Sequence, residues 1–455
     1  MSDYDAIVIG GGPAGEVCAG ELADAGMRVA LVERELVGGE CSYWGCIPSK
    51  TLLRPGEALA AAANAPGARE AITGALDPAA AFAWRDFMVS GHDDAGALPW
   101  LRDKGINLLR GDGRLDGPGV VAVDGERYRA RHVIIATGSE PVLPPIPGLS
   151  ELDGLWTNRE ATALTDVPRR LLVLGAGAVG VEMAQAIRRM GAEVAVVEGM
   201  DHVLPREPRA LGEALGEALA GEGIELHFGQ HASGARRDGD EYVLDLPDGD
   251  QLRGDRLLVA TGRRPRIDGL ELETASVGFD RHGIAVDGRM AAAPGVWAVG
   301  DVTGIWPLTY VGKYQARIAA ANILGKPREA SYGAVPRVVF TDPQAAAVGA
   351  PDGERTATVR MAEVPRTATY TRAYADHPGF LTLVADDDRL TGAYALGPEA
   401  GEWLQQATLA IRAGVPLSVM GDTIQPFPTF SEAFVEALAR LTARAAWDTR
   451  DAAAA

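Results

Sequence analysis

The sequence predicts an α/β fold with two parallel-sheet units of the same design, because one glycine-rich pattern occurs twice with the same framing. An apolar run enters Gly10-Gly-Gly12-Pro-Ala-Gly15 near the N-terminus and Gly175-Ala-Gly177-Ala-Val-Gly180 in mid-chain. In each copy a second apolar run ends on an acid, 18 residues after the third glycine. Strand, glycine turn, helix and strand in this order are typical of a doubly wound sheet. Both units are therefore predicted to be Rossmann-like.

Each glycine pattern has a chemical purpose. The glycines allow a tight turn, let the backbone approach a pyrophosphate and let the helix pack on the strand, while the acid binds a ribose hydroxyl. Each copy also closes on Ala-Thr-Gly after a further apolar run. The sequence thus predicts two dinucleotide sites. The first would use Gly10, Gly12, Pro13, Ala14, Gly15, Glu33, Ala136, Thr137 and Gly138, and the second Gly175, Gly177, Ala178, Val179, Gly180, Glu198 and Gly262.

The first unit is 41 residues longer than the second between its acid and its closing glycine, and the insertion carries two of the chain's three cysteines. Cys41 and Cys46 are close enough for a small disulfide ring that opens and closes. Pro48 suits the first turn of a helix, which places Cys46 at the helix start, where the dipole favours a thiolate. Lys50 falls one turn further on the same face. A structural disulfide or half of a metal site is the alternative, but such a short bridge restrains the unfolded chain little.

The remaining composition limits the class of protein. The length of 455 residues allows about three domains. No apolar run is long enough to span a bilayer, and residues 5–15 do not resemble a signal peptide. An accessible dithiol indicates a reducing compartment, so a cytoplasmic location is expected. The net charge of −19 disfavours nucleic acid and anionic lipid as partners, and no metal site is predicted. Cys18 lies among Ala and Leu and is expected to be a small buried residue.

Taken together, these motifs resemble the flavoprotein disulfide reductases, the family of dihydrolipoamide dehydrogenase, glutathione reductase and mercuric reductase. The likeness covers nearly the whole chain and includes Trp297-Ala-Val-Gly300-Asp301 and Val335-Pro-Arg-Val-Val-Phe-Thr-Asp-Pro343. It implies an FAD domain from residues 1–148 and 268–328, an NAD(P)H domain over 149–267 and an α+β dimerisation domain over 329–455. It also implies further FAD contacts from Gly39, Lys50, Gly113, Gly300 and Asp301.

The resemblance assigns roles to the redox residues. It implies that Cys46 is the thiolate beside the flavin and that Cys41 is the exchange thiol that meets substrate. Glu182, which follows Gly180 in the second glycine turn, matches the family's partner of the lysine, so a Lys50–Glu182 pair is expected beside the nicotinamide. Glu198 favours NADH, because a carboxylate repels the 2′-phosphate of NADPH. Arg206 and Arg209 are close enough in sequence to bind a 2′-phosphate, so NADPH is the alternative electron donor.

One departure from the family lies near the C-terminus. The family carries His-Pro-Thr-x-x-Glu, supplied by the second subunit of a homodimer, in which the histidine is the acid–base group and the glutamate orients it. This chain has Phe427-Pro-Thr-Phe430-Ser-Glu432, and among its seven histidines His377 is the closest in sequence. Because phenylalanine carries no proton, efficient turnover of dihydrolipoamide or glutathione is not expected. Mercuric reductase fits poorly too, since no cysteine follows Cys46.

The bulky residues near these motifs suggest an aromatic substrate pocket. Tyr43 and Trp44 lie between the cysteines, and Phe427 and Phe430 flank the altered segment. The same rings could instead pack a dimer interface. The sequence thus favours an enzyme that acts on a small disulfide or dithiol, aromatic or apolar and of the kind found in specialised metabolism. Its active site would contain Cys41, Cys46, Lys50, Glu182 and Glu432. A reductase of quinones or other non-thiol acceptors is the alternative, and a non-enzymatic flavoprotein subunit is a third interpretation.

Overall fold

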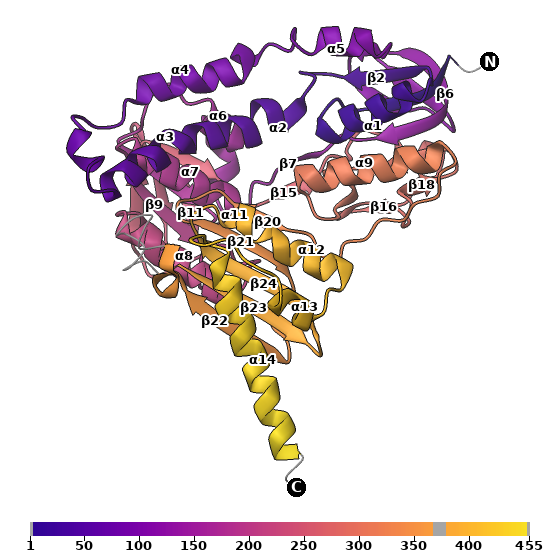
Figure 1. The fold of residues 1–455 in the computed structure, drawn as a ribbon. Helices are drawn as coiled ribbons and strands as arrows, with labels where there is room; N and C mark the ends of the chain where they lie inside the picture. The colour runs from indigo at the N-terminus through magenta and orange to yellow at the C-terminus, as the bar shows by residue number, and fades with distance from the viewer. Residues whose placement is uncertain (1–2, 367–378, 453–455) are drawn as a thin grey trace.

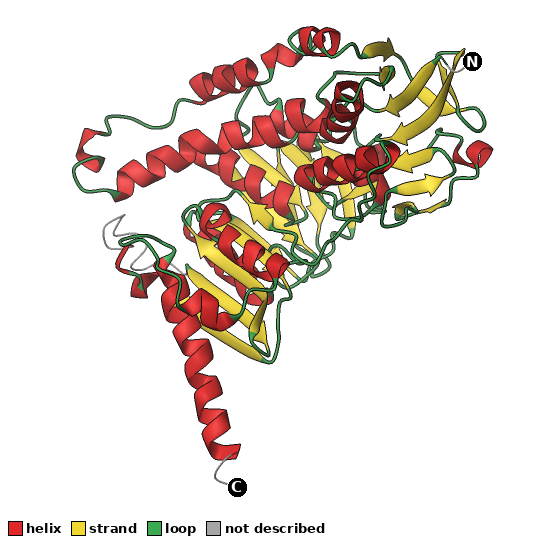
Figure 2. Ribbon diagram, turned by 45° about the vertical axis from the view of Figure 1, so that its right-hand side comes forward, coloured by secondary structure: helices red, strands yellow, loops and turns green. Residues whose placement is uncertain are grey.

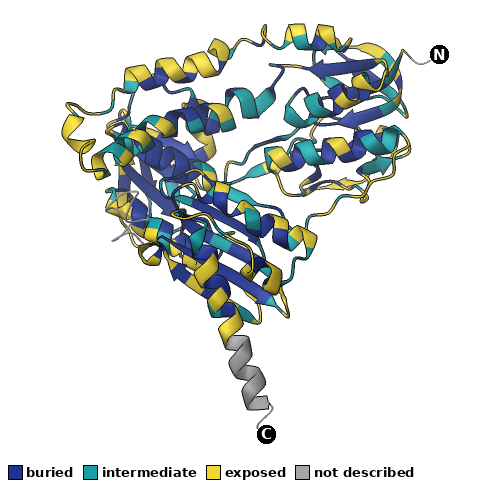
Figure 3. Ribbon diagram, in the orientation of Figure 1, coloured by how far each residue is buried: buried dark blue, intermediate teal, exposed yellow. Residues whose placement is uncertain are grey.

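The structure is a computed structural model and describes residues 3–366 and 379–452 (Figure 1). The chain builds two parallel-sheet units and a C-terminal antiparallel sheet, each covered by helices (Figure 2). The strands are mostly buried, whereas the outer faces of the helices are exposed (Figure 3). The predicted α/β fold with a duplicated parallel-sheet unit and a C-terminal α+β domain is confirmed.

The first sheet has the strand order β18-β19-β6-β1-β2-β3. The five strands β19, β6, β1, β2 and β3 are parallel to one another, and β1 lies in the middle of the sheet between β6 and β2. Helices α1 and α9 pack on one face, and the short antiparallel strands β4 and β5 extend from β6. The bounds are β1 Tyr4–Ile9, α1 Pro13–Asp24, β2 Val29–Glu33, β3 Asn107–Arg110, β4 Gly113–Leu115, β5 Val120–Val123, β6 Glu126–Ile135, β18 Ala291–Ala293, β19 Val296–Ala298 and α9 Thr309–Ile323.

The second sheet repeats the design with the order β10-β9-β8-β14, all parallel. Helices α7 and α8 cover one face, and a three-stranded antiparallel sheet covers the other. Two short strands, β7 and β15, pair where the chain crosses between the units. The bounds are β7 Ser139–Pro141, α6 Asn158–Thr162, β8 Arg170–Leu174, α7 Ala178–Arg189, β9 Glu193–Glu198, α8 Arg209–Gly221, β10 Glu225–Phe228, β11 Gly234–Asp238, β12 Glu241–Asp245, β13 Gln251–Gly254, β14 Arg256–Val259 and β15 Arg263–Pro265. The next two strands, β16 Phe279–Asp280 and β17 Gly283–Ile284, pair with each other, and Ile284 packs in the core of the first sheet.

The C-terminal sheet is antiparallel with the order β20-β21-β24-β23-β22. Helices α11 to α14 pack on it through a core of alanines, leucines and aromatic rings. The distal part of α14 projects away from the body of the molecule (Figures 1 and 2). The bounds are β20 Arg337–Val339, β21 Gln344–Gly349, β22 Arg355–Arg360, β23 Phe380–Asp386, β24 Arg389–Gly397, α11 Ala400–Trp403, α12 Gln405–Ala413, α13 Leu417–Gly421 and α14 Glu432–Ala452.

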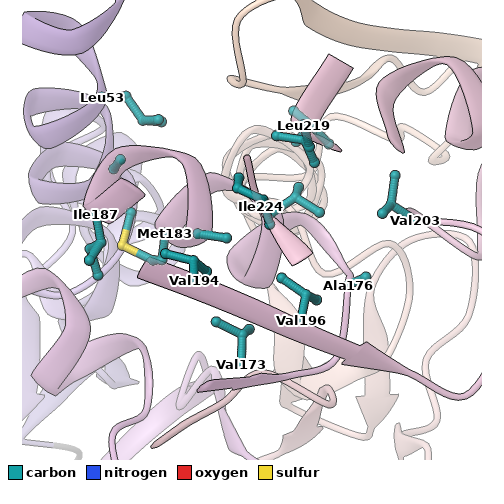
Figure 4. Close-up of a cluster of buried hydrophobic side chains, with 14 of the residues drawn as sticks. Leu53, Val173, Ala176, Met183, Ile187, Val194, Val196, Val203, Leu219 and Ile224 are labelled. Carbon is teal, nitrogen blue, oxygen red and sulfur yellow. The ribbon is translucent and has the colours of Figure 1, made fainter. Parts of the chain in front are cut away.

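The inserted segment joins the first unit to the second. It contains α2 (Gly39–Tyr43), α3 (Cys46–Asn64), α4 (Pro78–Met88) and α5 (Leu98–Asp103). Leu53 of α3 packs into the core of the second unit beside Met183 and Ile187 of α7 (Figure 4). The same core includes Phe380 and Leu396 of the C-terminal sheet. Through α3, the cysteine-bearing segment is therefore attached to the whole molecule.

A buried arginine fixes α4 against the second unit. Arg85 is 1% exposed, and its guanidinium donates hydrogen bonds to the carbonyl oxygens of Thr162 and Leu164, the latter at 2.9 Å. It also pairs with Asp86 at 2.6 Å and lies over the Phe82 ring. A buried arginine is tolerated because its donors are satisfied.

We expect Arg85→Met to lower the stability of the protein by roughly 2–3 kcal/mol, because two buried carbonyl groups lose a charged donor. Thermal unfolding, combined with limited proteolysis of residues 66–97, measures the effect. Arg102→Met, on the exposed face of α5, is the matched control. Equal melting temperatures and cleavage rates in the two variants would contradict this view of Arg85.

Candidate active site

The two glycine turns have the shapes that a dinucleotide requires. A Cβ added at Gly15 would lie 1.9 Å from the Gly10 carbonyl oxygen, and one at Gly180 would lie 2.0 Å from that of Gly175. By contrast, a Cβ at Gly12 or Gly177 would meet no atom within 4 Å. The third glycine of each pattern thus serves helix–strand packing, while the middle glycine faces open space that a pyrophosphate can fill.

Each acid of the duplicated pattern accepts one hydrogen bond from its own glycine turn and one from the amide two residues after the acid. The Glu33 carboxylate accepts from the Gly11 and Glu35 amides, both at 2.7 Å. The Glu198 carboxylate accepts from the Ala176 amide at 2.7 Å and the Met200 amide at 2.9 Å. The acids therefore stand beside the turns at the strand ends, as ribose recognition requires.

The other residues predicted for the first site gather around the same strand ends. The Asp301 carboxylate accepts a 2.7 Å hydrogen bond from Ser139, which follows Gly138, and the Gly300 amide donates to Gln315 of α9. The remaining neighbours are Pro13 and Ala14 in the first turn of α1, Gly39 on top of Gly12, Ala136 and Thr137 after β6, and Gly113 against Val32 and Ile9. Residues from three separated segments thus meet at one edge of the first sheet.

The second site is built in the same way at the ends of β8, β9 and β14. Ala178 and Val179 open α7, whose N-cap is Gly177. Gly262 follows β14, with a positive φ of 138° and open space beside it. The two predicted sites therefore lie in equivalent places on the two sheets.

The cysteine pair lies where the first sheet, α3 and α9 meet. Cys41 is in α2 and Cys46 is the first residue of α3, capped by Gly45, as the position of Pro48 predicts. Both are free thiols in the structure and are hydrogen-bonded to each other. Cys46 Sγ also lies 3.3 Å from Thr309 Oγ1, the first residue of α9. Thr309 is thus a third partner of the cysteine pair, and sequence reasoning missed it.

The surroundings give the two thiols different acidities. The hydrogen bond from Cys41, aided by Thr309 and the Lys50 charge, lowers the pKa of Cys46 from 9.0 to about 6, against the opposing effect of burial. The same hydrogen bond and burial raise the pKa of Cys41 far above its usual range. Near neutral pH, Cys46 is therefore the thiolate and Cys41 the thiol. Cys18 is fully buried, as expected, and burial raises its pKa to about 12.

An ion pair joins α3 to the second unit beside the cysteines. Lys50 Nζ lies 2.7 Å from Glu182 Oε2, and the Glu182 side chain is only 5% exposed. Glu182 also accepts a 2.9 Å hydrogen bond from the Phe340 amide, and the ammonium lies 4.7 Å from the centre of the Phe340 ring. The expected Lys50–Glu182 pair is present, and Phe340 is a further partner that the sequence did not reveal.

A second network, also missed, anchors α2. The Glu40 carboxylate accepts hydrogen bonds from Asn158 at 2.9 Å and Arg159 at 2.7 Å. The Arg159 guanidinium lies 4.0 Å from the centre of the Trp44 ring. This network connects the segment that carries Cys41 to α6. The sequence did not predict it, because the pattern around Glu40, two glycines before it and a cysteine after it, does not indicate a distant partner.

The four aromatic residues do not form the pocket that the sequence suggested. Tyr43 is 7% exposed and donates to the Val37 carbonyl oxygen, while Phe430 is 5% exposed in the core of the C-terminal domain. Trp44 is covered by Arg159 and packs against Tyr43 and His92. Tyr43 and Phe430 are core residues because their domains need large buried rings, so the prediction that they line a substrate pocket is wrong.

Phe427, by contrast, is 73% exposed on the protomer. Glu432 begins α14 and accepts a 3.3 Å hydrogen bond from the Thr429 amide, so it caps the turn that carries Phe427. His377 lies outside the described residues. Of residues 3–366 and 379–452, none forms a helix able to cross a membrane, and none belongs to a His, Cys, Asp or Glu group suited to a metal ion.

Comparison with known proteins matches this architecture over almost the whole chain. A family profile described as pyridine nucleotide-disulphide oxidoreductase matches residues 4–318, and the dimerisation domain of the same family matches residues 335–438. A dihydrolipoyl dehydrogenase of Thermus scotoductus is 38% identical over 96% of this chain and 97% of its own. A mercuric reductase of Staphylococcus aureus is 32% identical over 95% of this chain and 81% of its own.

Solved structures agree with these relatives. The copper(II) complex of the HOCl-induced flavoprotein disulfide reductase RclA from Escherichia coli superposes with a TM-score of 0.85, at 28% identity, over 95% of this chain and 99% of that one. LpdA from Mycobacterium tuberculosis gives a TM-score of 0.84 at 27% identity, over 96% of this chain and 99% of its own.

We expect the Cys46 thiolate to disappear as the pH falls through about 6, because its lowered pKa keeps it ionised only above that value. The rate of Cys46 alkylation by iodoacetamide in the reduced protein, located by mass spectrometry, follows the thiolate. Thr309→Val should move the midpoint to higher pH, since it removes a hydrogen bond that lowers the pKa. Thr423→Val, at an exposed turn, should leave it in place, and a Thr309→Val midpoint that did not rise would refute the assignment.

Proposed function

The chain belongs to the pyridine nucleotide-disulphide oxidoreductase family, and we propose that it passes electrons between a nicotinamide and a small disulfide or dithiol through Cys41 and Cys46. Enzymes of this family are FAD-dependent and use NAD(P)H as electron donor. The observation that carries the proposal is the placement of the cysteine pair: Cys46 begins α3, its sulfur lies 3.3 Å from Thr309 Oγ1, and the Lys50–Glu182 ion pair lies one helical turn further on.

The two glycine turns supply the binding sites for this chemistry. The residues around Gly12, Glu33 and Asp301 suit FAD, which when bound carries two electrons between nicotinamide and dithiol. The residues around Gly177 and Glu198 suit the nicotinamide dinucleotide. Lys50, held by Glu182, places a compact positive charge between the sites and beside the Cys46 thiolate.

The two cysteines act in turn. In the reducing direction the Cys41 thiol gives its proton to a base as its sulfur attacks one sulfur of the substrate disulfide, and the other substrate sulfur leaves as a thiolate that takes up a proton. The Cys46 thiolate then attacks Cys41, which releases the second substrate thiolate and forms the Cys41–Cys46 disulfide. Two electrons have moved to the substrate, and NAD(P)H restores them through FAD. Cys46 attacks readily because it is already ionised.

A second candidate function is the reduction of quinones or other non-thiol acceptors. It is favoured by Phe427, which stands where the family's acid–base histidine is expected and leaves thiol exchange without that group. In this alternative the dithiol stores electrons and the substrate does not bond to Cys41. Dihydrolipoamide dehydrogenase and mercuric reductase proper are less favoured, the second because no cysteine follows Cys46.

We also propose that the protein works as a homodimer whose active site includes the partner's 425–432 segment. The match to a dimerisation domain supports it. So does the exposed apolar surface of the C-terminal domain, which consists of Leu409, Val419, Ile424, Phe427 and Val435. A reducing compartment, such as the cytoplasm, suits an accessible dithiol.

Replacing the exchange thiol separates the two functions. We expect Cys41→Ser to lower NADH-dependent disulfide turnover at least about hundredfold, because the attacking nucleophile is removed. Cys18→Ala, at a buried site remote from substrate chemistry, is the matched control. Disulfide, dithiol and quinone substrates are screened with both variants after FAD content is equalised. Unchanged disulfide turnover in Cys41→Ser would refute the proposed function, and quinone turnover that survives alone would favour the second candidate.

The nicotinamide preference is testable at Glu198. We expect the wild-type kcat/KM to be higher with NADH than with NADPH. The Glu198→Ala variant should lower the ratio of the two values about tenfold, because it loses one hydrogen bond between a carboxylate and the ribose 2′-hydroxyl. Arg209 is already paired with Asp201 and Glu213, which disfavours its use for a 2′-phosphate. Glu193→Ala, at the exposed start of β9, is the control. A wild-type preference for NADPH would overturn the argument from the carboxylate.

A further inference from the structure

The acid that ends β9 in the second unit is followed by a glycine whose side-chain position is filled from elsewhere. Glu198 is the last residue of β9, and Gly199 comes directly after it. A Cβ added at Gly199 would lie 2.1 Å from Cε1 of His231 and 2.6 and 2.8 Å from the two ring nitrogens. The imidazole, which belongs to the turn between β10 and β11, therefore occupies the place of a side chain on the residue next to the acid.

Backbone hydrogen bonds fix this turn to the end of β9. The Gln230 amide donates a 3.1 Å hydrogen bond to the carbonyl oxygen of Glu198. The Gly229 amide donates one of 2.8 Å to the carbonyl oxygen of Met200. Because the two residues before His231 are bonded to the residues on either side of Gly199, the position of the ring is set by the fold.

The imidazole nitrogens are available to a ligand. His231 is exposed, and within residues 3–366 and 379–452 neither of its ring nitrogens makes a hydrogen bond or an ion pair. Each oxygen of the Glu198 carboxylate accepts one backbone amide, from Ala176 and from Met200, and keeps a lone pair for a further donor. A ligand that approaches this carboxylate therefore meets an acceptor and an imidazole without a partner.

The elements around the turn carry mainly negative or paired charges. Their charged and titratable groups are Glu198, Asp201, His202, Arg206 and Arg209 in the segment that follows β9, Glu225 and His227 on β10, and Asp248 between β12 and β13. Asp201 is paired with Arg209 and lies 3.7 Å from His202, and His227 is paired with Glu225. Asp248 accepts a 3.3 Å hydrogen bond from the Gln230 side chain. Of the described residues in this set and the turn itself, only Arg206 and His231 can therefore carry an unpaired positive charge.

The 2′ position of the adenosine distinguishes the two nicotinamide nucleotides. NADH has a hydroxyl there, which donates to the acid at the strand end, whereas NADPH has a phosphate, which the acid repels and a cation next to it accommodates. An imidazole can be either kind of neighbour, because histidine changes its charge between about pH 5 and 8. An imidazole beside this acid therefore makes the choice of nucleotide depend on pH.

We propose that His231 is the residue that admits the 2′-phosphate of NADPH to this site, and that it does so when its ring is protonated. The inference rests on the nucleotide site proposed around Glu198 and adds the residue that decides which nucleotide this site accepts. At alkaline pH the carboxylate acts alone, and the site selects NADH. At mildly acidic pH the imidazolium donates hydrogen bonds to the phosphate oxygens, which offsets the repulsion from the carboxylate.

The test measures binding, so it does not depend on knowing the substrate. Adenosine 2′,5′-bisphosphate and 5′-AMP differ only in the 2′-phosphate. Their dissociation constants are measured by isothermal titration calorimetry on the FAD-loaded protein at about pH 6 and about pH 8.5, which lie on either side of the range in which imidazoles usually titrate. NADP⁺ and NAD⁺ are titrated in the same way.

Four variants isolate the imidazole. His231→Gln removes its charge, and His282→Gln, at an exposed histidine of the first unit, is the matched control. Gly199→Ala keeps the histidine but adds a Cβ where the ring lies, so the ring must move. Its backbone is not strained by the change, since Gly199 does not have a positive φ. Arg206→Met removes the other unpaired cation.

We expect His231→Gln to bind the bisphosphate about tenfold more weakly than the wild type at about pH 6, the effect of one hydrogen bond to a charged group. The difference should vanish at about pH 8.5, where imidazoles are neutral. Gly199→Ala should behave like His231→Gln, and 5′-AMP should bind equally to all variants. The phosphate takes up its own proton near pH 6, and this effect is common to the proteins compared.

The outcomes separate the inference from the proposed function. If His231→Gln and His282→Gln bind the bisphosphate equally at about pH 6 while 5′-AMP still binds, the inference is overturned and the nucleotide site stands. Loss of bisphosphate binding in Arg206→Met alone would likewise overturn it. A wild type that binds neither 5′-AMP nor NAD⁺ would refute the nucleotide site and the inference together. His231→Arg, which is charged at both pH values, should bind the bisphosphate at about pH 8.5 as well, and no gain there would contradict the role of the charge.

Discussion

The arrangement of this protein depends on gathering polar and charged groups from three helices around one partly buried sulfur, that of Cys46. Burial alone would make Cys46 a poor acid, because the thiolate loses its hydration. The hydrogen bond from Cys41, the contact with Thr309 and the Lys50 charge reverse that effect. These three groups come from α2, α9 and α3, and each must be held in place by its own domain. The redox site therefore forms only when the first sheet, the insertion that carries α2 and α3, and helix α9 are packed together.

The same constraint explains how the units are joined. Helix α3 begins at Cys46 beside the first sheet and packs Leu52 and Leu53 into the core of the second. The Lys50–Glu182 pair then ties that helix to the glycine turn of the second unit, and Glu182 bonds the Phe340 amide near the start of the C-terminal domain. The Glu182 carboxylate is buried while the Lys50 side chain is 35% exposed, so desolvation of the carboxylate offsets much of the attraction and the pair contributes more to position than to stability. Its value here is that it fixes a charge between two cofactor sites.

The substitution at Phe427 separates the chain from the thiol enzymes it resembles, because a phenyl ring stands where the family has a histidine and carries no proton. On the protomer Phe427 is 73% exposed, shortly before α14 begins, so its ring is not part of the core of the C-terminal domain. Thiol exchange at Cys41 therefore takes its proton acceptor from another group or from water.

The duplicated glycine patterns, their acids and the Cys41-to-Lys50 segment were sufficient to predict the fold, the cofactors through family likeness, and the position of Cys46 at the start of a helix. They could do so because each of these features depends on neighbours in sequence: a turn, a strand end, the first turn of a helix. The Lys50–Glu182 pair also came from the sequence, though only through family likeness. Thr309 and Phe340 required the tertiary structure, because their partners lie many residues away on other elements. The aromatic pocket failed for the same reason: a ring's type does not say whether it faces a substrate or a core, and only packing puts Tyr43 and Phe430 inside.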